Sequence, residues 1–348
     1  MKGNIRIAIW GFGAMGSGIA KVLLRKIGVE IVGVCDIAPA RVGKSIYELL
    51  QVERAGRPEV VVTSEIQEVL ALQPEVCILA TDSFTAKAFP KIKTIVEAGV
   101  NVISTAEEMS YPRAQSPELS EQIDDLAKKH GVTVLGTGIN PGLMMDLLAI
   151  CLTGCMTDVE KVMCRRVNSL SPFGPAVMEE QGVGLSVEDF EKGVSAGTLA
   201  GHVGFAESVG MICQALGWKL DKFTQQMAPI VTGVDRRSPY GFAKAGDVAG
   251  VNMTGQGYVE GAAKVEMIHP QQIEPEMEGT HTGDYITIEG TPPVNMAIKP
   301  EVDGGIGTIA MCVNTIPHVI NARPGLKTML DLPVPHAIMG DFRAYLED

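Results

Sequence analysis

The stretch that decides the fold is Ile5-Arg6-Ile7-Ala8-Ile9-Trp10-Gly11-Phe12-Gly13-Ala14-Met15-Gly16. Its first half is a short β-branched run typical of a buried parallel strand, and a Gly-x-Gly-x-x-Gly motif follows without a spacer. Residues 17–26 have the composition of a helix, and residues 30–34 predict a second buried strand that ends at Cys35-Asp36. Strand, glycines, helix, strand and acid in this order form the βαβ pattern that binds dinucleotides.

Each glycine of this motif has a physical reason. Gly11 permits a tight turn, Gly13 lets a pyrophosphate approach the backbone, and Gly16 lets the helix pack closely against the strand. The phosphates would lie at the positive end of the helix dipole, held by backbone N–H groups. The alternative is a glycine-rich turn that binds no ligand. We expect the cofactor loop to comprise Gly11, Phe12, Gly13, Ala14, Met15 and Gly16.

Asp36 indicates which dinucleotide binds. It lies about twenty residues past the last glycine, where its carboxylate can accept hydrogen bonds from both adenosine ribose hydroxyls. Its negative charge would repel a 2′-phosphate, which favours NAD over NADP. Arg41 lies near enough in sequence to bind that phosphate if Asp36 turned away, so the use of both cofactors stays open.

Length and composition limit the class of protein. A chain of 348 residues is expected to form two domains. The 29 Lys and Arg against 41 Asp and Glu give a net charge of −12, which argues against nucleic acid and anionic membrane surfaces as partners. No apolar run approaches membrane-spanning length, and the first strand begins too early for a signal peptide, so we expect a cytoplasmic protein.

The seven cysteines are expected to be reduced thiols, most of them buried, as is usual in that compartment. Cys151 and Cys155 have i, i+4 spacing, but no second His or Cys pair stands nearby in the sequence to complete a metal site. We therefore expect neither a metal centre nor a catalytic cysteine.

Strand and helix patterns alternate over residues 1–145, which predicts a doubly wound parallel sheet of the Rossmann type. The expected helices cover residues 40–50, 66–72, 85–98 and 117–130, and the further strands cover residues 60–63, 76–80, 101–104 and 133–135. Ligands bind such sheets beyond the carboxyl ends of the strands, so polar residues at those ends are the candidates for chemistry.

Residues 146–305 have a different pattern. A strand at 161–167 and a glycine-rich helical segment at 187–216 are followed by strand-like stretches at 226–234, 257–268 and 284–290. Strands without intervening helices predict an α+β substrate and dimerisation domain with a mixed or antiparallel sheet. An apolar helix near 307–321 lies in a C-terminal segment, residues 306–348, that is expected to return to the first domain.

Polar side chains follow two of the predicted strands. Glu107 and Glu108 come directly after strand 101–104, where one of two diverging carboxylates can bind a substrate ammonium or act as a general base. A solvated pair that opens a loop is the alternative. Thr81 and Asp82 follow strand 76–80, and we expect Asp82 to contact the cofactor's ribose or its nicotinamide side.

The segment Gly138-Ile139-Asn140-Pro141-Gly142 lies where strand 133–135 ends and a helix is expected to begin. Asn140 can cap that helix, and Pro141 fits its first turn. In the functional alternative, the N–H groups from Gly138 onward and the Asn140 side chain hold the nicotinamide carboxamide, and Pro141 shapes the floor under the ring.

Candidates for substrate contacts come from the second half of the chain. His202 lies among small residues that allow close approach. Arg166 is one of five candidate partners for a substrate carboxylate, and the sequence favours none over the others, which are Arg165, Arg236, Arg237 and Lys264. An arginine can bind a carboxylate bidentately, although such an arginine more often belongs to a surface ion pair. Asn314 and Thr315 are polar residues inside an apolar helix. They either make internal hydrogen bonds or line a pocket, and we favour the pocket.

Three segments together resemble a known family. They are the glycine motif at 9–18, Thr105-Ala106-Glu107-Glu108-Met109-Ser110-Tyr111-Pro112, and Gly136-Thr137-Gly138-Ile139-Asn140-Pro141-Gly142. They are similar to the 2,4-diaminopentanoate dehydrogenases, which belong with the dihydrodipicolinate-reductase-like dehydrogenases and which native amine dehydrogenases resemble. The similarity spans essentially the full length of the chain. The second and third segments are more specific to this family than the first, which many dehydrogenases share.

This resemblance implies NAD(P)-dependent oxidative deamination of 2,4-diaminopentanoate at C4, which gives 2-amino-4-oxopentanoate and ammonia in ornithine degradation. It also implies a homodimer that forms through the second domain. One of Glu107 and Glu108 would be the catalytic carboxylate. Glu108 is favoured, because the related homoserine dehydrogenase pattern holds a functional Lys at the fourth place of this segment.

Two other functions remain open. The chain can be another dehydrogenase of the same broad class that acts on a different amine, imine or aldehyde-derived substrate. It can also be a protein that senses NAD(P) without catalysis, although polar residues at several strand ends and a full second domain argue against this.

Overall fold

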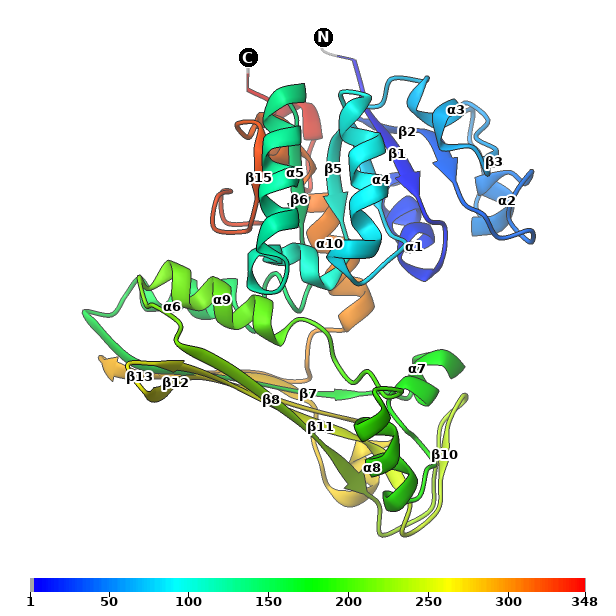
Figure 1. The fold of residues 1–348 in the computed structure, drawn as a ribbon. Helices are drawn as coiled ribbons and strands as arrows, with labels where there is room; N and C mark the ends of the chain where they lie inside the picture. Colours follow the sequence, from blue (N-terminus) through cyan, green and yellow to red (C-terminus); the bar gives the residue numbers. More distant parts are fainter. Residues whose placement is uncertain (1–2, 348) are drawn as a thin grey trace. The chain divides into compact units, whose positions relative to one another are not determined.

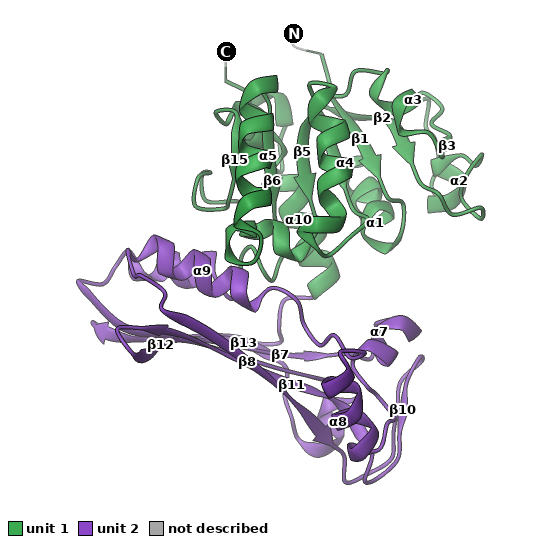
Figure 2. Ribbon diagram, in the orientation of Figure 1, with its two compact units in different colours: residues 1–143, 304–348 green, residues 144–303 purple. Residues whose placement is uncertain are grey.

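The computed structural model describes residues 3–347 (Figure 1). The chain forms two compact units, each with a large sheet of its own (Figure 2). Unit 1 comprises Met1–Leu143 and Gly304–Asp348, and unit 2 comprises Met144–Asp303. The C-terminal part of the chain is therefore part of the same unit as the N-terminal part.

Unit 1 is built on a seven-stranded sheet in which every pair of neighbours is parallel. The order is β15-β6-β5-β4-β1-β2-β3. The strands are β1 (Ile5–Trp10), β2 (Val29–Cys35), β3 (Val62–Thr63), β4 (Val76–Leu79), β5 (Asn101–Ser104), β6 (Thr133–Gly136) and β15 (Gly325–Lys327). Without β15 this is the 3-2-1-4-5-6 order of dinucleotide-binding sheets. The prediction of a doubly wound Rossmann fold is confirmed.

Helices cover both faces of this sheet, which explains why its central strands are continuous apolar runs. Ile7, Ile9 and Ile78 have no exposed surface. Figure 1 shows α4 and α5 in front of the sheet and α10 behind it, where α10 packs against α1. The helices are α1 (Ala14–Leu23), α2 (Ile46–Leu50), α3 (Ile66–Leu70), α4 (Thr85–Glu97), α5 (Pro117–His130), α10 (Gly304–Asn314) and α11 (Ile316–Asn321).

Two predictions of helix starts in this region are wrong. The helix expected at residues 40–50 begins only at Ile46, because residues 38–44 form turns and Gly43 has a φ of 80°. Asn140 does not cap a helix, because Gly142 leaves the helical region with a φ of 129°. The next helix, α6 (Leu147–Thr153), is capped instead by Asp146, whose Oδ1 accepts the Leu147 N–H at 2.6 Å.

The C-terminal part of unit 1 differs from its prediction in two ways. The helix expected near 307–321 is divided into α10 and α11 at Thr315, just before Pro317, which has no N–H to continue the first helix. The three-residue strand β15 was not predicted, because it is too short to show a periodic pattern. It extends the parallel sheet beside β6.

Unit 2 is built on a six-stranded sheet with the order β14-β13-β7-β12-β11-β8. Only the β7–β12 pair is parallel, which confirms the expected mixed sheet of an α+β domain. The strands are β7 (Asp158–Ser169), β8 (Lys222–Val231), β11 (Val248–Val259), β12 (Ala262–Gln272), β13 (Gly283–Thr291) and β14 (Val294–Ile298). A small separate sheet pairs β9 (Arg236–Arg237) with β10 (Phe242–Ala243).

Two expected elements of unit 2 are each divided by a glycine turn. The strand expected at 257–268 is the junction of β11 and β12, where Glu260 (φ 53°) and Gly261 (φ 77°) form a hairpin turn. The helical segment expected at 187–216 is divided into α8 (Val187–Ala196) and α9 (Phe205–Ala215). Gly197, with a φ of 68°, ends the first of these helices.

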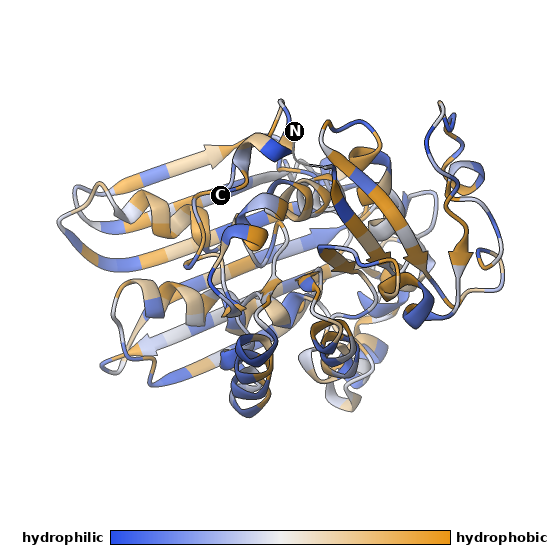
Figure 3. Ribbon diagram, turned by 90° about the horizontal axis from the view of Figure 1, so that it is seen from above, coloured by the Kyte–Doolittle hydropathy of each residue, from blue (hydrophilic) through white to orange (hydrophobic). Residues whose placement is uncertain are grey.

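α6 and α9 pack against each other and on the mixed sheet. Hydrophilic and hydrophobic bands alternate along the long strands (Figure 3), as expected where the two faces of a sheet meet different surroundings. The remaining helix of this unit, α7, covers Pro175–Glu180. Among residues 3–347, no helix is both long enough and apolar enough to cross a membrane.

Candidate functional site

The glycine loop lies between β1 and α1, and two of its glycines cannot be replaced without a clash. Gly11 has a φ of 96°, and a Cβ there would lie 2.4 Å from the Ala80 carbonyl oxygen. A Cβ at Gly16 would lie 1.9 Å from the carbonyl oxygen of Gly11. These distances give the tight turn and the close helix–strand packing that the sequence predicted for these positions.

The N-terminus of α1 is open to a ligand. Gly13 is its N-cap and offers no side-chain hydrogen bond, and a Cβ at Gly13 would meet nothing within 4 Å. The first N–H groups of a helix have no acceptor within the helix, and the helix dipole adds positive potential there. The loop therefore fits a dinucleotide pyrophosphate, held by the backbone of Ala14 and Met15.

Asp36 is buried at the end of β2, where its carboxylate already has protein partners. Oδ2 accepts the Phe12 N–H at 2.6 Å, and Oδ1 accepts the Ala38 N–H at 2.7 Å. Arg41 Nη1 lies 3.2 Å from Oδ2. Although burial acts to raise the pKa of Asp36, the Ala38 and Phe12 hydrogen bonds and the Arg41 charge lower it overall. Asp36 is thus an anion that joins the glycine loop to Arg41.

Thr81 and Asp82 follow β4 and are linked to a lysine that the sequence analysis did not identify. Lys91 Nζ, from α4, lies 2.6 Å from Asp82 Oδ2 and 3.0 Å from Thr81 Oγ1. Thr81 Oγ1 also donates to Asp82 Oδ2 at 2.5 Å. Burial acts to raise the pKa of Asp82, but the bonds from Lys91 and Thr81 lower it overall. The three side chains form one polar group beyond the carboxyl end of β4.

Glu107 and Glu108 lie in a 3₁₀ turn, η1 (Glu107–Ser110), that follows β5. The Glu108 carboxylate is well anchored: Oε2 accepts the N–H of Thr85, the first residue of α4, at 2.7 Å, and Gln115 Nε2 lies 3.5 Å from Oε1. A helix N-terminus stabilises such an anion. Both glutamate side chains are half-buried, so the pair is more than a solvated loop opening.

The segment 138–142 follows β6 as a compact loop. The N–H of Ile139 donates to Thr308 Oγ1 of α10 at 3.2 Å, and a Cβ at Gly142 would lie 2.4 Å from the Gly138 carbonyl oxygen. Pro141 is buried and Asn140 is half-buried. Asn140 caps no helix, so its role beside the nicotinamide is the prediction that stays.

Asn314 and Thr315 make internal hydrogen bonds in unit 1. Thr315 Oγ1 is fully buried and donates to the Met311 carbonyl oxygen at 2.9 Å. Asn314 Oδ1 accepts the Ile338 N–H at 3.2 Å. The structure therefore favours the internal hydrogen-bond alternative over the pocket wall that we preferred from the sequence. A hydroxyl bonded one turn back along its own helix explains why an apolar helix tolerates threonine.

In unit 2, Arg166 is a buried cation with a buried partner. Its side chain is 3% exposed, and Nη1 lies 2.5 Å from Asp284 Oδ1. Nη2 donates to the Val302 carbonyl oxygen, and the Val302 N–H donates back to Asp284 Oδ2 at 2.9 Å. Arg166 is therefore no surface ion pair. It supplies fixed positive potential on the helix-covered side of the mixed sheet.

Two histidines lie near this cation. The rings of His202 and His269 meet edge to face with centroids 4.7 Å apart, and His269 Nε2 lies 2.8 Å from Asn168 Oδ1. Burial and the charge of Arg166 lower the pKa of His202 to about 4. Burial, His202 and Arg166 lower the pKa of His269 well below its ordinary value. Both rings are neutral at pH 7 and can donate or accept hydrogen bonds.

The sequence analysis missed His269, Asn168 and Asp284. His269 shares one face of β12 with buried Val265 and Met267, and strand alternation would have placed it there. The strand was predicted to end at residue 268, whereas β12 continues to Gln272 and includes His269. Asn168 and Asp284 reach this group through strand pairing distant in sequence, for which no local pattern exists.

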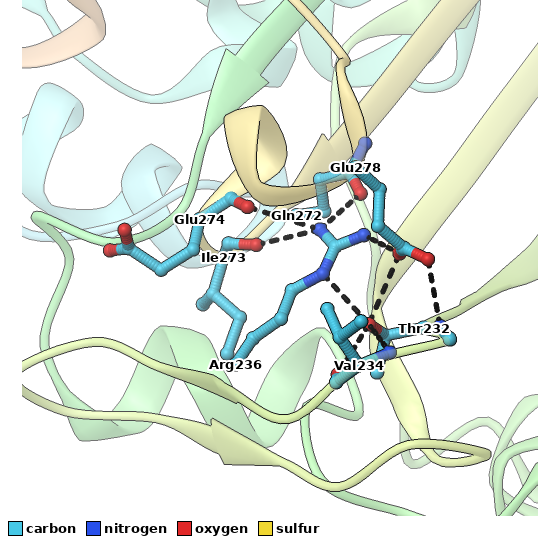
Figure 4. Close-up of polar contacts among 8 residues, drawn as sticks. Thr232, Val234, Arg236, Gln272, Ile273, Glu274 and Glu278 are labelled. Carbon is cyan, nitrogen blue, oxygen red and sulfur yellow. Dashed lines mark hydrogen bonds and ion pairs between the residues drawn. The ribbon is translucent and has the colours of Figure 1, made fainter.

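A second buried cation of unit 2 lies in a structural cluster (Figure 4). Arg236 is 2% exposed and donates to Thr232 Oγ1, to Gln272 Oε1 at 2.7 Å and to the Ile273 carbonyl oxygen at 3.0 Å. Glu278 pairs with its Nη2. Because the guanidinium of Arg236 already has protein partners at Nε, Nη1 and Nη2, its role is structural and it is not a candidate for substrate contact.

Five cysteines are buried, as expected, and only Cys151 and Cys155 are exposed. Burial raises the pKa of Cys35 and of Cys213 to about 11 and of Cys312 to about 12, so these thiols are protonated and inert at neutral pH. Between residues 3 and 347 no three His, Cys, Asp or Glu side chains are grouped to hold a metal ion.

Two known families match the two parts of the chain. The family described as "2,4-diaminopentanoate dehydrogenase C-terminal domain" matches residues 143–348. The family described as "Oxidoreductase family, NAD-binding Rossmann fold" matches residues 5–137. The second match covers the glycine loop, Asp36 and both glutamates. The dinucleotide that fits this loop is thus a nicotinamide cofactor.

Individual relatives agree with these matches. A 2,4-diaminopentanoate dehydrogenase of Acetoanaerobium sticklandii is 61% identical over 99% of this chain and 98% of its own length. An amine dehydrogenase of Streptomyces virginiae is 25% identical, with 96% and 98% covered. The solved structure of an amine dehydrogenase from Mycobacterium smegmatis superposes with a TM-score of 0.84 at 29% identity, covering 97% of this chain and 98% of that one.

Proposed function

Since the chain belongs to the 2,4-diaminopentanoate dehydrogenase family and is an oxidoreductase acting on CH–NH₂ groups, we propose that its substrate is 2,4-diaminopentanoate, oxidised at C4. The observation that carries this proposal is 61% identity over 99% of the chain to an enzyme of that name. At this identity over the full length, both the cofactor loop and the unit 2 cluster fall within the matched region.

The proposed reaction is balanced in atoms and charge. The C4 ammonium, oxidised nicotinamide cofactor and water give the C4 ketone of 2-amino-4-oxopentanoate, ammonium, reduced cofactor and one proton. A nicotinamide cofactor held by the Gly11–Gly16 loop would supply the hydride acceptor for C4. An ammonium has no lone pair to assist hydride loss, so a protein base must first take its proton. The resulting iminium is then hydrolysed by a water that the same base can activate.

We assign this base to Glu108, with Glu107 as the alternative. Anchoring by Thr85 and Gln115 holds the Glu108 carboxylate in one orientation, as general-base catalysis requires. The anchoring bonds leave lone pairs on both oxygens, because a carboxylate can accept about four hydrogen bonds. Glu107 is the neighbouring carboxylate in the same 3₁₀ turn, which makes it the matched control.

The test is the pair Glu108→Gln and Glu107→Gln. Glutamine keeps an oxygen for the Thr85 N–H, so Glu108→Gln removes the base while preserving the cap of α4. We expect kcat/KM for deamination to fall by about 10²–10⁴-fold in Glu108→Gln, with cofactor affinity unchanged and Glu107→Gln close to wild type. Near wild-type turnover in Glu108→Gln refutes the assignment, and a large loss only in Glu107→Gln transfers the role to Glu107.

For the cofactor, we propose that NAD is preferred and NADP is also accepted. Asp36 opposes a 2′-phosphate by its charge, while Arg41, 3.2 Å away, offsets part of that charge and can bind a phosphate. We assign the cofactor contacts to three groups of residues. The first is the loop Gly11–Gly16, and the second is Asp36, Thr81 and Asp82 near the riboses. The third is Gly138, Asn140 and Pro141 beside the nicotinamide.

For the substrate, we propose that the unit 2 cluster of Arg166, His202, His269 and Asn168 recognises the amino-acid end of the molecule. A buried guanidinium beside neutral imidazoles offers positive potential and hydrogen bonds to a carboxylate. The structure argues against Asn314 and Thr315 in this role, since their side chains bond internally.

A second candidate function is a general amine dehydrogenase, which the Streptomyces and Mycobacterium relatives favour. The two functions are distinguished by comparing 2,4-diaminopentanoate with 2-aminopentane, which keeps the same reacting group but lacks the amino-acid end. A strong preference for the diamino acid that is lost in Asn168→Leu supports the proposal. Equal kcat/KM for the two amines supports the general enzyme, and cofactor binding without turnover of any amine refutes both.

We further propose a homodimer in the cytoplasm, as the family resemblance implies. Light scattering on the purified full-length chain gives the molar mass in solution directly. A value near the 37.0 kDa of one chain would refute the dimer.

A further inference from the structure

Unit 1 contains a pocket of about 430 Å³ at its C-terminal segment, here called the C-terminal pocket. Its lining comes from α11 and the two residues after it, from the end of β15 and from the segment that follows this strand. The lining carries charges of both signs: Arg323 and Lys327 are cations, and Asp331 and Glu347 are anions. A volume of this size accommodates a small metabolite together with water.

The two cations of this pocket are not used by the fold. Within residues 3–347, neither the Arg323 guanidinium nor the Lys327 ammonium makes an ion pair or a side-chain hydrogen bond. Arg323 lies two residues before β15, and Lys327 is the last residue of that strand. Two such cations in the lining of one pocket can bind a carboxylate, and arginine can do so bidentately.

The same lining offers a carboxylate suited to an ammonium. Asp331 is held in place because its Oδ2 accepts the Thr328 N–H at 2.8 Å and the Thr328 hydroxyl at 3.0 Å. His318 is 9% exposed, and its Nε2 is buried without a hydrogen-bond partner in the described chain. Burial and the neighbouring His336 lower the pKa of His318, so this imidazole adds no further positive charge to the lining at neutral pH.

We propose that the C-terminal pocket binds a small zwitterionic amino acid, with its carboxylate at Arg323 and Lys327 and its ammonium at Asp331. A simple anion would leave the Asp331 charge uncompensated, and a simple amine would meet two cations. A ligand with both groups complements both signs of charge in the lining. This proposal concerns a surface of unit 1 that takes no part in the proposed reaction and does not depend on it.

The test uses three probes that share a short alkyl chain: L-norvaline has both charged groups, valerate has only the carboxylate, and butylamine has only the ammonium. Inorganic phosphate serves as a fourth, purely anionic probe. Binding to the full-length chain is measured by equilibrium dialysis for wild type, for the double variant R323Q/K327M, and for the control R25Q/K129M. The control removes the same two charges from exposed positions outside the pocket.

We expect saturable L-norvaline binding that weakens by about tenfold or more in R323Q/K327M, since two charge-assisted contacts are lost, and that is unchanged in the control. Valerate, butylamine and phosphate should bind more weakly than L-norvaline. Cofactor affinity and thermal unfolding of R323Q/K327M should match wild type, which shows that the variant is folded. Equal L-norvaline binding by wild type and R323Q/K327M, or no saturable binding at all, refutes the site. Valerate or phosphate binding as tightly as L-norvaline refutes the zwitterion.

Discussion

Replacement of Asp36 by asparagine should turn the cofactor preference from NAD toward NADP. The side chain is 7% exposed and carries a full negative charge beside the glycine loop. At about 5 Å and an effective dielectric constant of about 40–80, this charge opposes a 2′-phosphate by about 1.5–3 kcal/mol. Its removal should raise the ratio of kcat/KM for NADP to that for NAD by roughly ten- to a hundredfold.

The ratio is the right quantity to measure because the substitution has a second effect. Phe12 and Ala38 both donate their N–H groups to the two Asp36 oxygens, and asparagine has only one oxygen to accept them. The unpaired donor costs about 1–3 kcal/mol and loosens the loop for both cofactors alike. That cost cancels in the ratio.

Arg41→Leu provides the opposite change and a check on the reasoning. It removes the cation that lies 3.2 Å from Asp36 Oδ2, so the preference for NAD should strengthen. Steady-state kinetics with each cofactor on wild type, both single variants and the double variant complete the cycle. An unchanged NADP-to-NAD ratio in Asp36→Asn, with both values of kcat/KM lowered equally, would refute the electrostatic explanation.

Two further predictions concern the stability of unit 2. Arg236→Met should lower the free energy of unfolding by about 3–5 kcal/mol, because it leaves several buried acceptors without the guanidinium (Figure 4). Urea unfolding, followed by the fluorescence of Trp218 in a Trp10→Phe background, measures this change. A decrease below about 1 kcal/mol would contradict the structural role of Arg236. His202 and His269 are neutral in the folded chain but protonate near pH 6.5 when unfolded, so stability should fall as the pH drops from about 6.5 to about 4, by up to about 1.4 kcal/mol per pH unit for each ring. His202→Gln should show a shallower decline, and the same slope as wild type would contradict this.

The strands and helices of unit 1 were predicted well because each of them has a sequence pattern that lies within a few consecutive residues. A buried parallel strand is a continuous apolar run, a helix has its own period, and the Gly11–Gly16 motif has few structural solutions. The predictions failed where local pattern is weak: β15 has only three residues, and the apolar alternation across Glu260-Gly261 hides a hairpin. A glycine in a left-handed turn ends a strand without changing the hydrophobic pattern around it.

The same distinction applies to the candidate site: residues next to a predicted strand could be identified from the sequence, whereas contacts between distant residues could not. Glu108 and Asp36 were found from sequence because each directly follows a predicted strand. The anchoring of Glu108 on the Thr85 N–H joins residues 23 positions apart, and no periodicity encodes that bond. Arg166 was a candidate by residue type alone, and only its pairing with Asp284, 118 residues away, makes it a buried cation.

By itself, the sequence determined the dinucleotide-binding fold, the glycine loop with its acid, and the two glutamates that follow β5, since each depends on residues close together in the chain. Only the tertiary structure decided that Asp36 is bonded to Phe12 and Arg41, that His269 and Asn168 join His202 near Arg166, and that Thr315 serves the fold. These outcomes depend on burial and on pairing between distant strands, which remove charges from water and bring partners within hydrogen-bond distance only once the whole unit has folded.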